Sequence, residues 1–203
     1  MHAIKTEAEL RAVIGAEPPG LAEKNQPRLN GFAVDFIAKS PFLVLSTADA
    51  EGRIDASPKG DAPGFVEVED EGHLLIPDRP GNRLAYGHQN LLVNPRVGVL
   101  FMIPGTPETL RVNGQASLSA DPELLDRLAA RGKPAVLVIR VAVEEVFFHC
   151  AKAFIRSELW RPDTWGARHE VSFGKMFAAA KNAPPEAAAA LDEAVNADYR
   201  DNL

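Results

Sequence analysis

Four short β-rich segments follow one another near the start of the chain, with only turn residues between them. They are Phe42 to Thr47, Ile54 to Ser57, Phe65 to Val68 and His73 to Ile76. The separating residues are rich in Gly, Pro and Asp, which favour turns for steric reasons. Parallel strands need a long crossover between them, and this region has no room for a helix. The spacing therefore predicts antiparallel pairing and argues against a βαβ fold.

The rest of the chain carries longer expected strands and few helices. The further strands are Arg96 to Ile103, Thr109 to Ser119 and Ala135 to Phe148, and Lys152 to Ile155 is compatible with a last short one. Helices are expected at Thr6 to Gly15, at Phe32 to Lys39, at Leu84 to Val93 and in the tail from Gly174 to Tyr199. Another is expected to begin after Asp121, with Asp121 as N-cap and Pro122 in the first helical position. Many short antiparallel strands with peripheral helices favour a mainly β fold, specifically a β-barrel.

The composition excludes several classes of protein. The 203 residues fit one domain with extensions, and the net charge of −6 argues against nucleic-acid binding, which normally needs a basic face. Cys150 is the single cysteine, so no internal disulfide can form and a reducing cytoplasm is expected. No stretch approaches the roughly 20 apolar residues of a membrane span. The charges close to the N-terminus do not fit a signal peptide. We expect a cytoplasmic protein without membrane or nucleic-acid partners.

The turn from Pro77 to Leu84 is the strongest functional signal. It places Arg79, Asn82 and Arg83 between an expected strand and an expected helix. Backbone N–H groups at a helix start, together with guanidinium charges, form a good phosphate site. The alternative is a solvated turn in which Asp78 favours the positive end of the helix dipole. Two arginines have the wrong sign for that dipole unless an anion is bound, which favours the anion site.

A second basic turn, Ser57-Pro58-Lys59-Gly60-Asp61, follows another short strand. Ser57 offers a hydroxyl, and Asp61 could orient the ammonium group of Lys59. The alternative is an ordinary surface lysine. Two basic turns at the ends of neighbouring strands, in an acidic chain, favour a phosphorylated cofactor.

Two further features carry open alternatives. Arg111 is out of phase with the apolar Leu110 and Val112, so it points into a ligand cleft or to solvent. His149 and Cys150 suggest metal chemistry, but four tetrahedral ligands cannot be assembled convincingly from them and the other histidines. We therefore expect no metal, and no side chain is assigned as a catalytic residue.

Taken in order, several motifs resemble the pyridoxamine 5′-phosphate oxidase-like family of FMN-binding split barrels, specifically its probable FMN-dependent enzyme branch. The resemblance runs from about Pro41 to Trp165. The motifs that carry it are Pro41-Phe42, Ser57 to Asp61, Pro77 to Arg83, Asn94-Pro95-Arg96-Val97-Gly98, Glu108 to Gly114, His149 to Ala153, Arg156-Ser157 and Leu159-Trp160. The Arg-x-His ending of the vitamin B6 oxidase is not evident, because Arg168-His169 matches it only loosely. Pyridoxamine phosphate is therefore not assigned as the substrate.

The resemblance implies a six-stranded antiparallel Greek-key split barrel that forms a homodimer with FMN at the subunit interface. It divides the chain into a helical extension (1–40), the FMN-binding barrel (41–165) and a helical tail packed on the barrel (166–203). It also implies the cofactor contacts, which are Ser57, Lys59, Ile76, Asp78, Arg79, Asn82, Arg83, Thr109, Arg111, Arg156 and Trp160. Arg83 matches the first member of the family's basic pair, whereas Leu84 replaces the second, and Arg79 is the candidate to compensate for that loss.

The function implied is that of an FMN-dependent oxidoreductase acting on an unidentified small substrate, with NAD(P)H as one candidate electron donor. Two alternatives remain open. The protein could be a non-enzymatic flavin carrier or sensor, or a relative that binds haem or a deazaflavin in the same fold.

Overall fold

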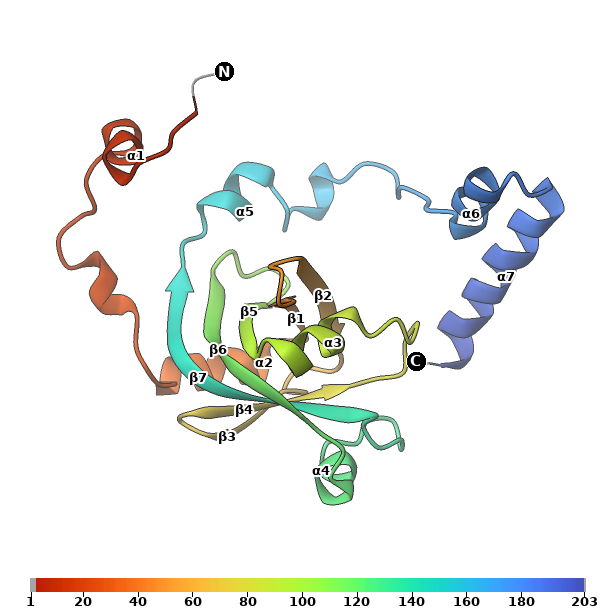
Figure 1. Ribbon diagram of the computed structural model, residues 1–203, viewed down its shortest axis with the longest axis horizontal. Coiled ribbons are helices and arrows are strands. Elements are labelled where there is room, and N and C mark those ends of the chain that lie inside the picture. Colours follow the sequence, from red (N-terminus) through yellow and green to blue (C-terminus); the bar gives the residue numbers. More distant parts are fainter. Residues whose placement is uncertain (1–2, 203) are drawn as a thin grey trace.

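A single antiparallel sheet forms the body of the protein in the computed structural model, which describes residues 3–202 (Figure 1). Its strands are β1 (Phe42–Ala48), β2 (Ile54–Gly60), β3 (Glu67–Asp70), β4 (His73–Asp78), β5 (Arg96–Met102), β6 (Thr109–Ser119) and β7 (Leu137–His149). They pair in the order β2-β1-β5-β6-β7-β4-β3, and every pairing is antiparallel. The prediction of a mainly β fold with peripheral helices is confirmed. The predicted count of six strands is not, because this sheet has seven and is not closed.

The sheet curls around one apolar core. Alternate residues of β1 and β5 are buried, including Leu43, Leu45 and Phe101, as expected of strands with one face turned inward. β4 differs, because four successive residues from Leu74 to Pro77 are buried. Leu74 and Ile76 face the main core, and Leu75 packs in a second cluster on the other side. β4 is therefore covered on both faces.

Two helices close the two clusters. α2 (Gly31–Lys39) begins at Asn30, whose side chain accepts a hydrogen bond from the Ala33 N–H at 3.0 Å, and it buries Phe36 and Ile37 in the main core. α4 (Pro122–Arg127) covers the second cluster with Leu124 and Leu125. The predicted cap of α4 is confirmed, because Asp121 accepts a hydrogen bond from the Glu123 N–H at 2.9 Å. Part of the segment predicted as an N-terminal extension is thus core structure.

A third helix, α3 (Tyr86–Val93), packs on the sheet and buries Leu91 in the main core. The remaining helices lie at the periphery and are α1 (Glu7–Ile14), η1 (Leu21–Lys24), α5 (Lys152–Ser157), η2 (Pro162–Thr164), α6 (Phe173–Lys181) and α7 (Pro185–Asp201). The short strand expected at Lys152 to Ile155 is wrong, because this segment forms α5. The physical reason is the length of β6, whose first residue, Thr109, already pairs with His149. Beyond His149, the described part of the chain offers no neighbouring strand to pair with the backbone of an extended segment.

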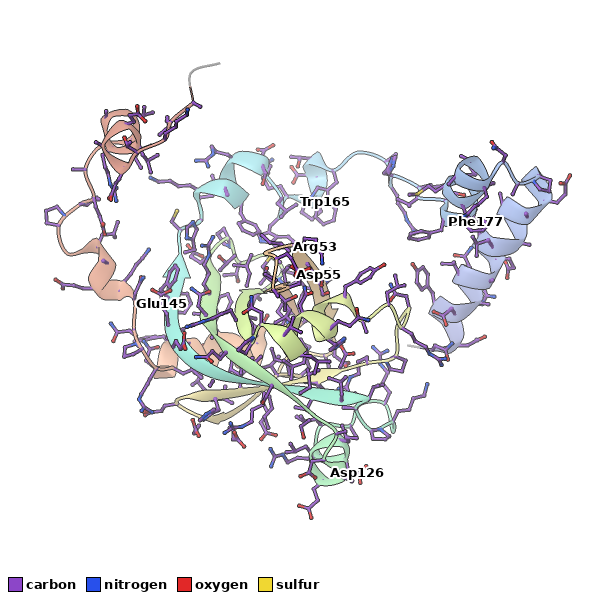
Figure 2. The ribbon with its side chains drawn as sticks, in the orientation of Figure 1. Arg53, Asp55, Asp126, Glu145, Trp165 and Phe177 are labelled. Atoms are coloured by element: carbon purple, nitrogen blue, oxygen red, sulfur yellow. The ribbon has the colours of Figure 1, made fainter. Side chains whose placement is uncertain are left out.

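The C-terminal helices form a hairpin of their own. α6 and α7 pack on each other, and Asp192 of α7 accepts hydrogen bonds from the Gly174 N–H and the Ser172 hydroxyl at the start of α6. Figure 1 shows this hairpin standing beside the sheet, with the end of α7 near the loop before α3. Figure 2 places Phe177 on the hairpin and Trp165 on the linker that leads to it. Between residues 3 and 202, no helix combines the length and apolar character needed to cross a membrane.

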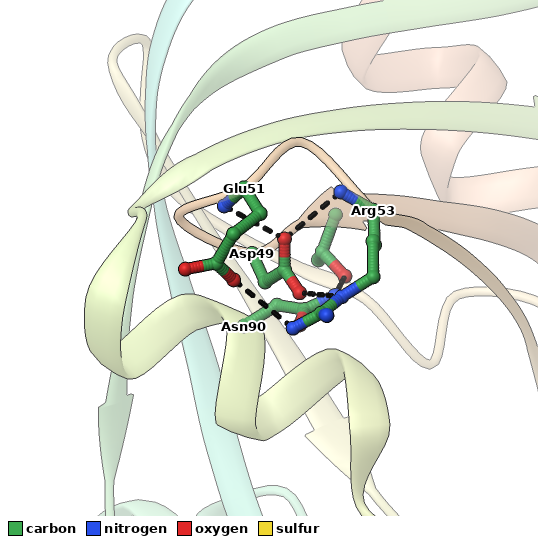
Figure 3. Close-up of polar contacts among 5 residues, drawn as sticks. Asp49, Glu51, Arg53 and Asn90 are labelled. Carbon is green, nitrogen blue, oxygen red and sulfur yellow. Dashed lines mark hydrogen bonds and ion pairs between the residues drawn. The ribbon is translucent and has the colours of Figure 1, made fainter.

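A polar network fixes the end of the β1–β2 hairpin beside α3 (Figure 3). The carboxylate of Asp49 accepts hydrogen bonds from the backbone N–H groups of Glu51 and Arg53 at 3.0 and 2.8 Å, and from the Arg53 guanidinium at 2.6 Å. Next to it, the side-chain amide of Asn90 donates to the Thr47 hydroxyl at 3.0 Å. This last bond ties α3 to β1, and the network pairs Arg53 with Asp49 and Glu51.

At Gly114, β6 and β7 approach each other too closely to leave room for a side chain. A Cβ atom there would lie 2.0 Å from the Ala142 carbonyl oxygen, at the register shift between the two strands. We expect Gly114→Ala to lower the free energy of unfolding by about 1–3 kcal/mol or more, because the strands must separate. Urea unfolding followed by far-UV circular dichroism measures the change. Gly166→Ala is the control, because no atom lies within 4 Å of the added Cβ. Equal unfolding midpoints for the two variants would contradict this view of the strand pairing.

Candidate functional site

A large cavity opens where β2, the end of β4 and the start of α3 meet. Its volume is about 1010 Å³, and its walls come from residues 55–60 and 77–88, from Val136 and Leu137 before and within β7, and from Asp198 and Asn202 at the end of α7. We call it the Lys59 cavity. The site thus combines both basic turns singled out in the sequence with parts of the chain far from them.

Alternate side chains of β2 form one wall of the cavity. Asp55, Ser57 and Lys59 are half-buried while their neighbours are exposed, so these three side chains share one face. The Ser57 hydroxyl donates a hydrogen bond of 2.6 Å to the Asp55 carboxylate. Lys59 is the last of these three residues along β2.

Lys59 forms an ion pair with Asp78, the last residue of β4. Both side chains are mostly buried, and Nε2 of His88 on α3 lies 3.3 Å from the second carboxylate oxygen of Asp78. The His88 contact lacks the geometry of a hydrogen bond, so its buried Nε2 remains without a hydrogen-bond partner among the described residues. Burial, the largest influence, raises the pKa of Asp78, but His88 and Lys59 together outweigh it and hold this pKa below its ordinary value. Asp78 is therefore ionised at neutral pH. The prediction that Asp61 orients Lys59 is wrong, because Asp78 takes this role.

Arg79 is turned away from the centre of the cavity. Its guanidinium donates to Asp61 at 2.8 Å and to the Leu128 carbonyl oxygen at 2.9 Å. Asp61 thus neutralises Arg79 and not Lys59. The sequence suggested Arg79 as a substitute for the basic residue that Leu84 replaces. In the structure, the Arg79 charge is already neutralised by Asp61.

The loop before α3 presents Arg83 differently. Asn82 accepts a hydrogen bond from the Leu84 N–H at 3.0 Å, and Arg83 adopts a left-handed backbone conformation with φ of 61°. Ala85, the N-cap of α3, is also left-handed, with φ of 54°. Such conformations cost energy in residues other than glycine and tend to occur at functional sites. Within residues 3–202, Arg83 has no carboxylate oxygen within 4.0 Å, so its charge is uncompensated.

The start of α3 adds backbone donors to the same wall. The first N–H groups of a helix have no partner within it, and no side chain caps α3. Gly87 allows this turn to approach β2 closely, because a Cβ atom there would lie 3.0 Å from Asp55 Oδ2 and 3.5 Å from the Ser57 hydroxyl. The helix start, Ser57 and Arg83 consequently face one space, which can accept an anion.

The cavity as a whole is electrically balanced. The carboxylates of Asp55, Asp78 and Asp198 line it together with three basic side chains, those of Lys59, Arg79 and Arg83. Since Lys59 and Arg79 are paired inside the protein, Arg83 supplies the available positive charge. The arrangement fits a single anionic group at the loop end better than a large polyanion.

Six of the residues predicted to contact the cofactor line this cavity. They are Ser57, Lys59, Asp78, Arg79, Asn82 and Arg83. Ile76, one residue before the cavity wall, is fully buried in the main core, so its side chain cannot line the same space.

The other four predicted residues lie elsewhere. Thr109 is buried at the start of β6, and Arg111 lies 5.9 Å from the centre of the Phe147 ring on the outer side of the sheet. Arg156 is exposed on α5. Trp160 donates from its indole N–H to the Thr106 carbonyl oxygen at 2.9 Å and stacks on Phe154. Within one chain these residues and the Lys59 cavity form separate groups.

Sequence reasoning missed Asp55, His88, Asp198 and Asn202 as parts of the cavity. The alternation of β2 could have revealed Asp55, because it shares a face with Ser57 and Lys59. The position of His88 depends on how tightly α3 packs on β2. Asp198 and Asn202 reach the site from the far end of the chain, and nothing in the local sequence signals that.

One cluster with metal-ligating side chains lies outside the cavity. Ligand atoms of Glu69, Asp70 and His73 come within 4.8 Å of one another at the β3–β4 turn. Glu69 accepts a hydrogen bond from Arg140 at 2.7 Å, and Asp70 accepts from the Gly72 N–H and contacts His73. The turn geometry and the Arg140 pair account for this cluster.

Asp78→Asn tests the buried ion pair. At neutral pH we expect it to lower the free energy of unfolding by about 1–3 kcal/mol, because Lys59 stays mostly buried without its partner. Asp35→Asn is the control and should change little, because Asp35 and Lys39 form an exposed pair. Chemical denaturation of all three proteins measures the differences.

The pH dependence of that difference has a definite sign. The pKa of Asp78 lies below its ordinary value of 3.8, so the stability that its charge contributes is complete above pH 3.8 and is lost as pH falls through the lowered value. The gap between the wild type and the Asp78→Asn variant should therefore shrink on acidification below about pH 3.8. A gap that stays constant through this range would show that the Asp78 charge contributes nothing.

Several solved structures are similar to part of this chain. A putative pyridoxamine 5′-phosphate oxidase from Lactobacillus delbrueckii is 24% identical over 60% of this chain and 95% of its own, with a TM-score of 0.48. HupZ of Group A Streptococcus is 16% identical over 59% and 93%, with a TM-score of 0.49. An FMN-binding protein from Syntrophomonas wolfei is 11% identical over 58% and 88%, with a TM-score of 0.44. The curated proteins contain no match to this sequence.

The family model described as pyridoxamine 5′-phosphate oxidase matches residues 29–150. This segment begins just before α2 and ends just after β7, so it contains the whole sheet and all of the Lys59 cavity except the contribution of α7. The match covers more than half of the chain, which therefore belongs to the pyridoxamine 5′-phosphate oxidase family.

Proposed function

We propose that the protein binds FMN with the phosphate group at the Arg83 end of the Lys59 cavity. The observation that carries this proposal is the uncompensated Arg83 guanidinium next to the uncapped start of α3. A phosphate group at this position would receive a charge-assisted hydrogen bond from Arg83 and backbone hydrogen bonds from the helix start. Membership in the family supports the choice of a phosphorylated cofactor.

The residues present fit such a cofactor. The volume of about 1010 Å³ lies at the upper end of the range for cofactor pockets. Gly87 keeps the wall open where any side chain would crowd Asp55 and Ser57. The buried Nε2 of His88, which has no hydrogen-bond partner among residues 3–202, faces Asp78 at the same wall. A ligand with hydrogen-bonding groups can satisfy groups of this kind.

We further propose that the protein acts as a flavin-dependent oxidoreductase on a small substrate. When bound, the flavin supplies the hydride or electron transfer. The chain's own residues bind and orient it. Asp78 holds Lys59 in place through the buried ion pair, and Ser57 is fixed by Asp55. His88 lies beside the same carboxylate, with Nε2 3.3 Å from Asp78.

The active unit proposed is a homodimer. Large apolar side chains that line the cavity are exposed, namely Leu84, Tyr86 and Val136, and Ile54 at the start of the edge strand β2 is 79% exposed. Exposed apolar side chains around one cavity favour contact with another protein surface. Residues that the family resemblance assigns to the cofactor but that lie outside this cavity, such as Arg156 and Trp160, would then come from the second subunit.

A non-enzymatic flavin carrier is the second candidate, and one observation favours it. Each carboxylate that lines the cavity already accepts a hydrogen bond from a neighbour: Asp55 from Ser57, Asp78 from Lys59 and Asp198 from Asn202. These bonds account for the three carboxylates without a role in proton transfer. Electron transfer between bound molecules does not need a general base.

Reconstitution with FMN tests cofactor binding. We expect the purified protein to bind one FMN per chain, with quenched flavin fluorescence and flavin bands in the visible spectrum. A Soret band would point to haem instead, and a colourless protein that ignores added FMN would overturn the proposal. Anaerobic addition of NADH or NADPH to the FMN complex then separates the enzyme from the carrier, because only the enzyme should be reduced at a useful rate.

Arg83→Ala tests the phosphate position. We expect it to weaken FMN binding roughly 10- to 100-fold, because a hydrogen bond between charged groups is lost. Riboflavin, which lacks the phosphate, should bind to the variant and to the wild type equally. Titration of protein fluorescence or flavin fluorescence measures both affinities.

Arg53→Ala is the matched control, because Arg53 is engaged by Asp49 and Glu51 at the other end of β2. It should leave FMN binding unchanged. Equal losses of FMN and riboflavin in the Arg83→Ala variant would refute the phosphate assignment.

A further inference from the structure

A second groove lies on the outer side of the sheet, under the N-terminal segment. Its volume is about 450 Å³, and its polar walls include Lys24, Asn25, Arg111 and His149, with Phe147 at its base. Backbone hydrogen bonds of 2.9 and 2.8 Å between Gln26 and Val146 hold the N-terminal segment against β7. We call this space the Lys24 groove. Its wall is therefore built by chain pairing and not by a loose loop.

The groove carries an excess of positive charge around one aromatic ring. Lys24 Nζ lies 5.5 Å and the Arg111 guanidinium carbon 5.9 Å from the centre of the Phe147 ring, within range for cation–π contacts. In the described part of the chain, neither cation has a carboxylate oxygen within 4.0 Å. Two unpaired cations that converge on one half-buried ring repel each other, and a bound anion would relieve that repulsion.

The acidic groups near the groove are already engaged. Both carboxylate oxygens of Glu145 accept hydrogen bonds, from the side-chain amides of Asn25 at 2.8 Å and Asn113 at 2.7 Å. Glu17 lies 3.9 Å from Arg11. The positive charge of Lys24 and Arg111 is thus directed into the groove, although the protein as a whole carries a net charge of −6.

A buried acceptor marks the same space. Asn25 Oδ1 is buried and has no hydrogen-bond donor among residues 3–202. A buried polar atom without a partner is costly, so its presence next to an open groove favours a ligand with a hydroxyl or N–H group. Burial, followed by the charges of Arg111 and Lys24, lowers the pKa of His149 below its ordinary value of 6.5. The imidazole is therefore neutral at pH 7 and can accept or donate a further hydrogen bond.

Apart from the ion pair between Arg11 and Glu17, the remaining walls are mainly apolar. Ile14, Leu21 and Ala22 of the N-terminal segment line the groove together with Phe147. Inorganic ions gain nothing from such surfaces, whereas the hydrocarbon part of an organic anion does. The charge, the orphaned acceptor and the apolar walls together define one class of ligand.

We propose that the Lys24 groove binds a small organic carboxylate with an apolar body and a hydrogen-bond donor. The carboxylate lies between Lys24 and Arg111, the body packs on Phe147, and the donor reaches Asn25 Oδ1. The site is separate from the Lys59 cavity: Glu145 on β7 and Asp55 on β2, which mark the two places, lie well apart in Figure 2. The proposal does not depend on flavin binding.

The test uses 4-hydroxybenzoate as the probe for the full-length protein, followed by isothermal titration calorimetry. We expect one site per chain, and at least tenfold weaker binding after Arg111→Gln or Lys24→Gln. Lys181→Gln, at an exposed position on α6, is the matched control and should bind like the wild type. Unchanged affinity in both groove variants would overturn the proposal.

Two further ligands separate charge from shape. Neutral 4-hydroxybenzamide and inorganic phosphate should each bind at least tenfold more weakly than 4-hydroxybenzoate. Equal binding of the amide would refute the role of the two cations, and equal binding of phosphate would refute the apolar body. Chemical-shift mapping on the wild type needs no variant: shifts confined to Lys24, Phe147 and their neighbours support the site, whereas shifts around Lys59 and Arg83, or no binding at millimolar concentrations, reject it.

Discussion

The ion pair between Lys59 and Asp78 decides the shape of the functional end of this protein. β2 is one edge of the sheet, and β4 is the last strand but one at the opposite edge. Their ends can meet only if the sheet curls through all the strands between them. The pair is mostly buried, and a buried charge is tolerated only with its partner in place. The curl, the cavity and the position of α3 therefore depend on one another.

This pairing also distributes the roles of the three basic side chains in the cavity. A lysine and an arginine that are already neutralised by Asp78 and Asp61 shape the wall and add little attraction for a further anion. Among the three, only Arg83 has no carboxylate partner in the described part of the chain. Its backbone is left-handed, at the end of the loop before α3. Placing the free charge next to the uncapped helix start concentrates anion binding at one point of a cavity whose other two basic side chains are already paired.

The sequence predicted the strands well because their signals are local. Turn residues separate the strands between residues 42 and 76, and alternation identifies the buried face of β6. The error at residues 152–155 has a different origin, since β-forming side chains cannot make a strand where no neighbour pairs with them. The number of strands in the sheet and its open edges likewise depend on which strands pair with one another. No local sequence pattern contains that information.

The candidate site was predictable in part for the same reason. The two basic turns are visible in the sequence, and the structure brings both to one cavity. What the sequence cannot show is the partner of each charge. Arg79 is engaged by Asp61 and by the Leu128 carbonyl oxygen, which lies on a distant segment, and Lys59 is engaged by Asp78 from another strand. A motif identifies charged residues, whereas three-dimensional pairing decides which of them remain available.

Arg111 illustrates how the period of two in a strand constrains function. Leu110 and Val112 are fully buried, so Arg111 must point away from the core. A slip of one residue would bring it inward, but it would also expose both apolar neighbours, which costs far more than one hydrogen bond returns. Within one chain Arg111 is therefore held at Phe147 beside Lys24. Any contact between Arg111 and a ligand in the Lys59 cavity has to involve a second copy of the chain, and such a copy must also displace or accommodate the N-terminal segment that pairs with Val146.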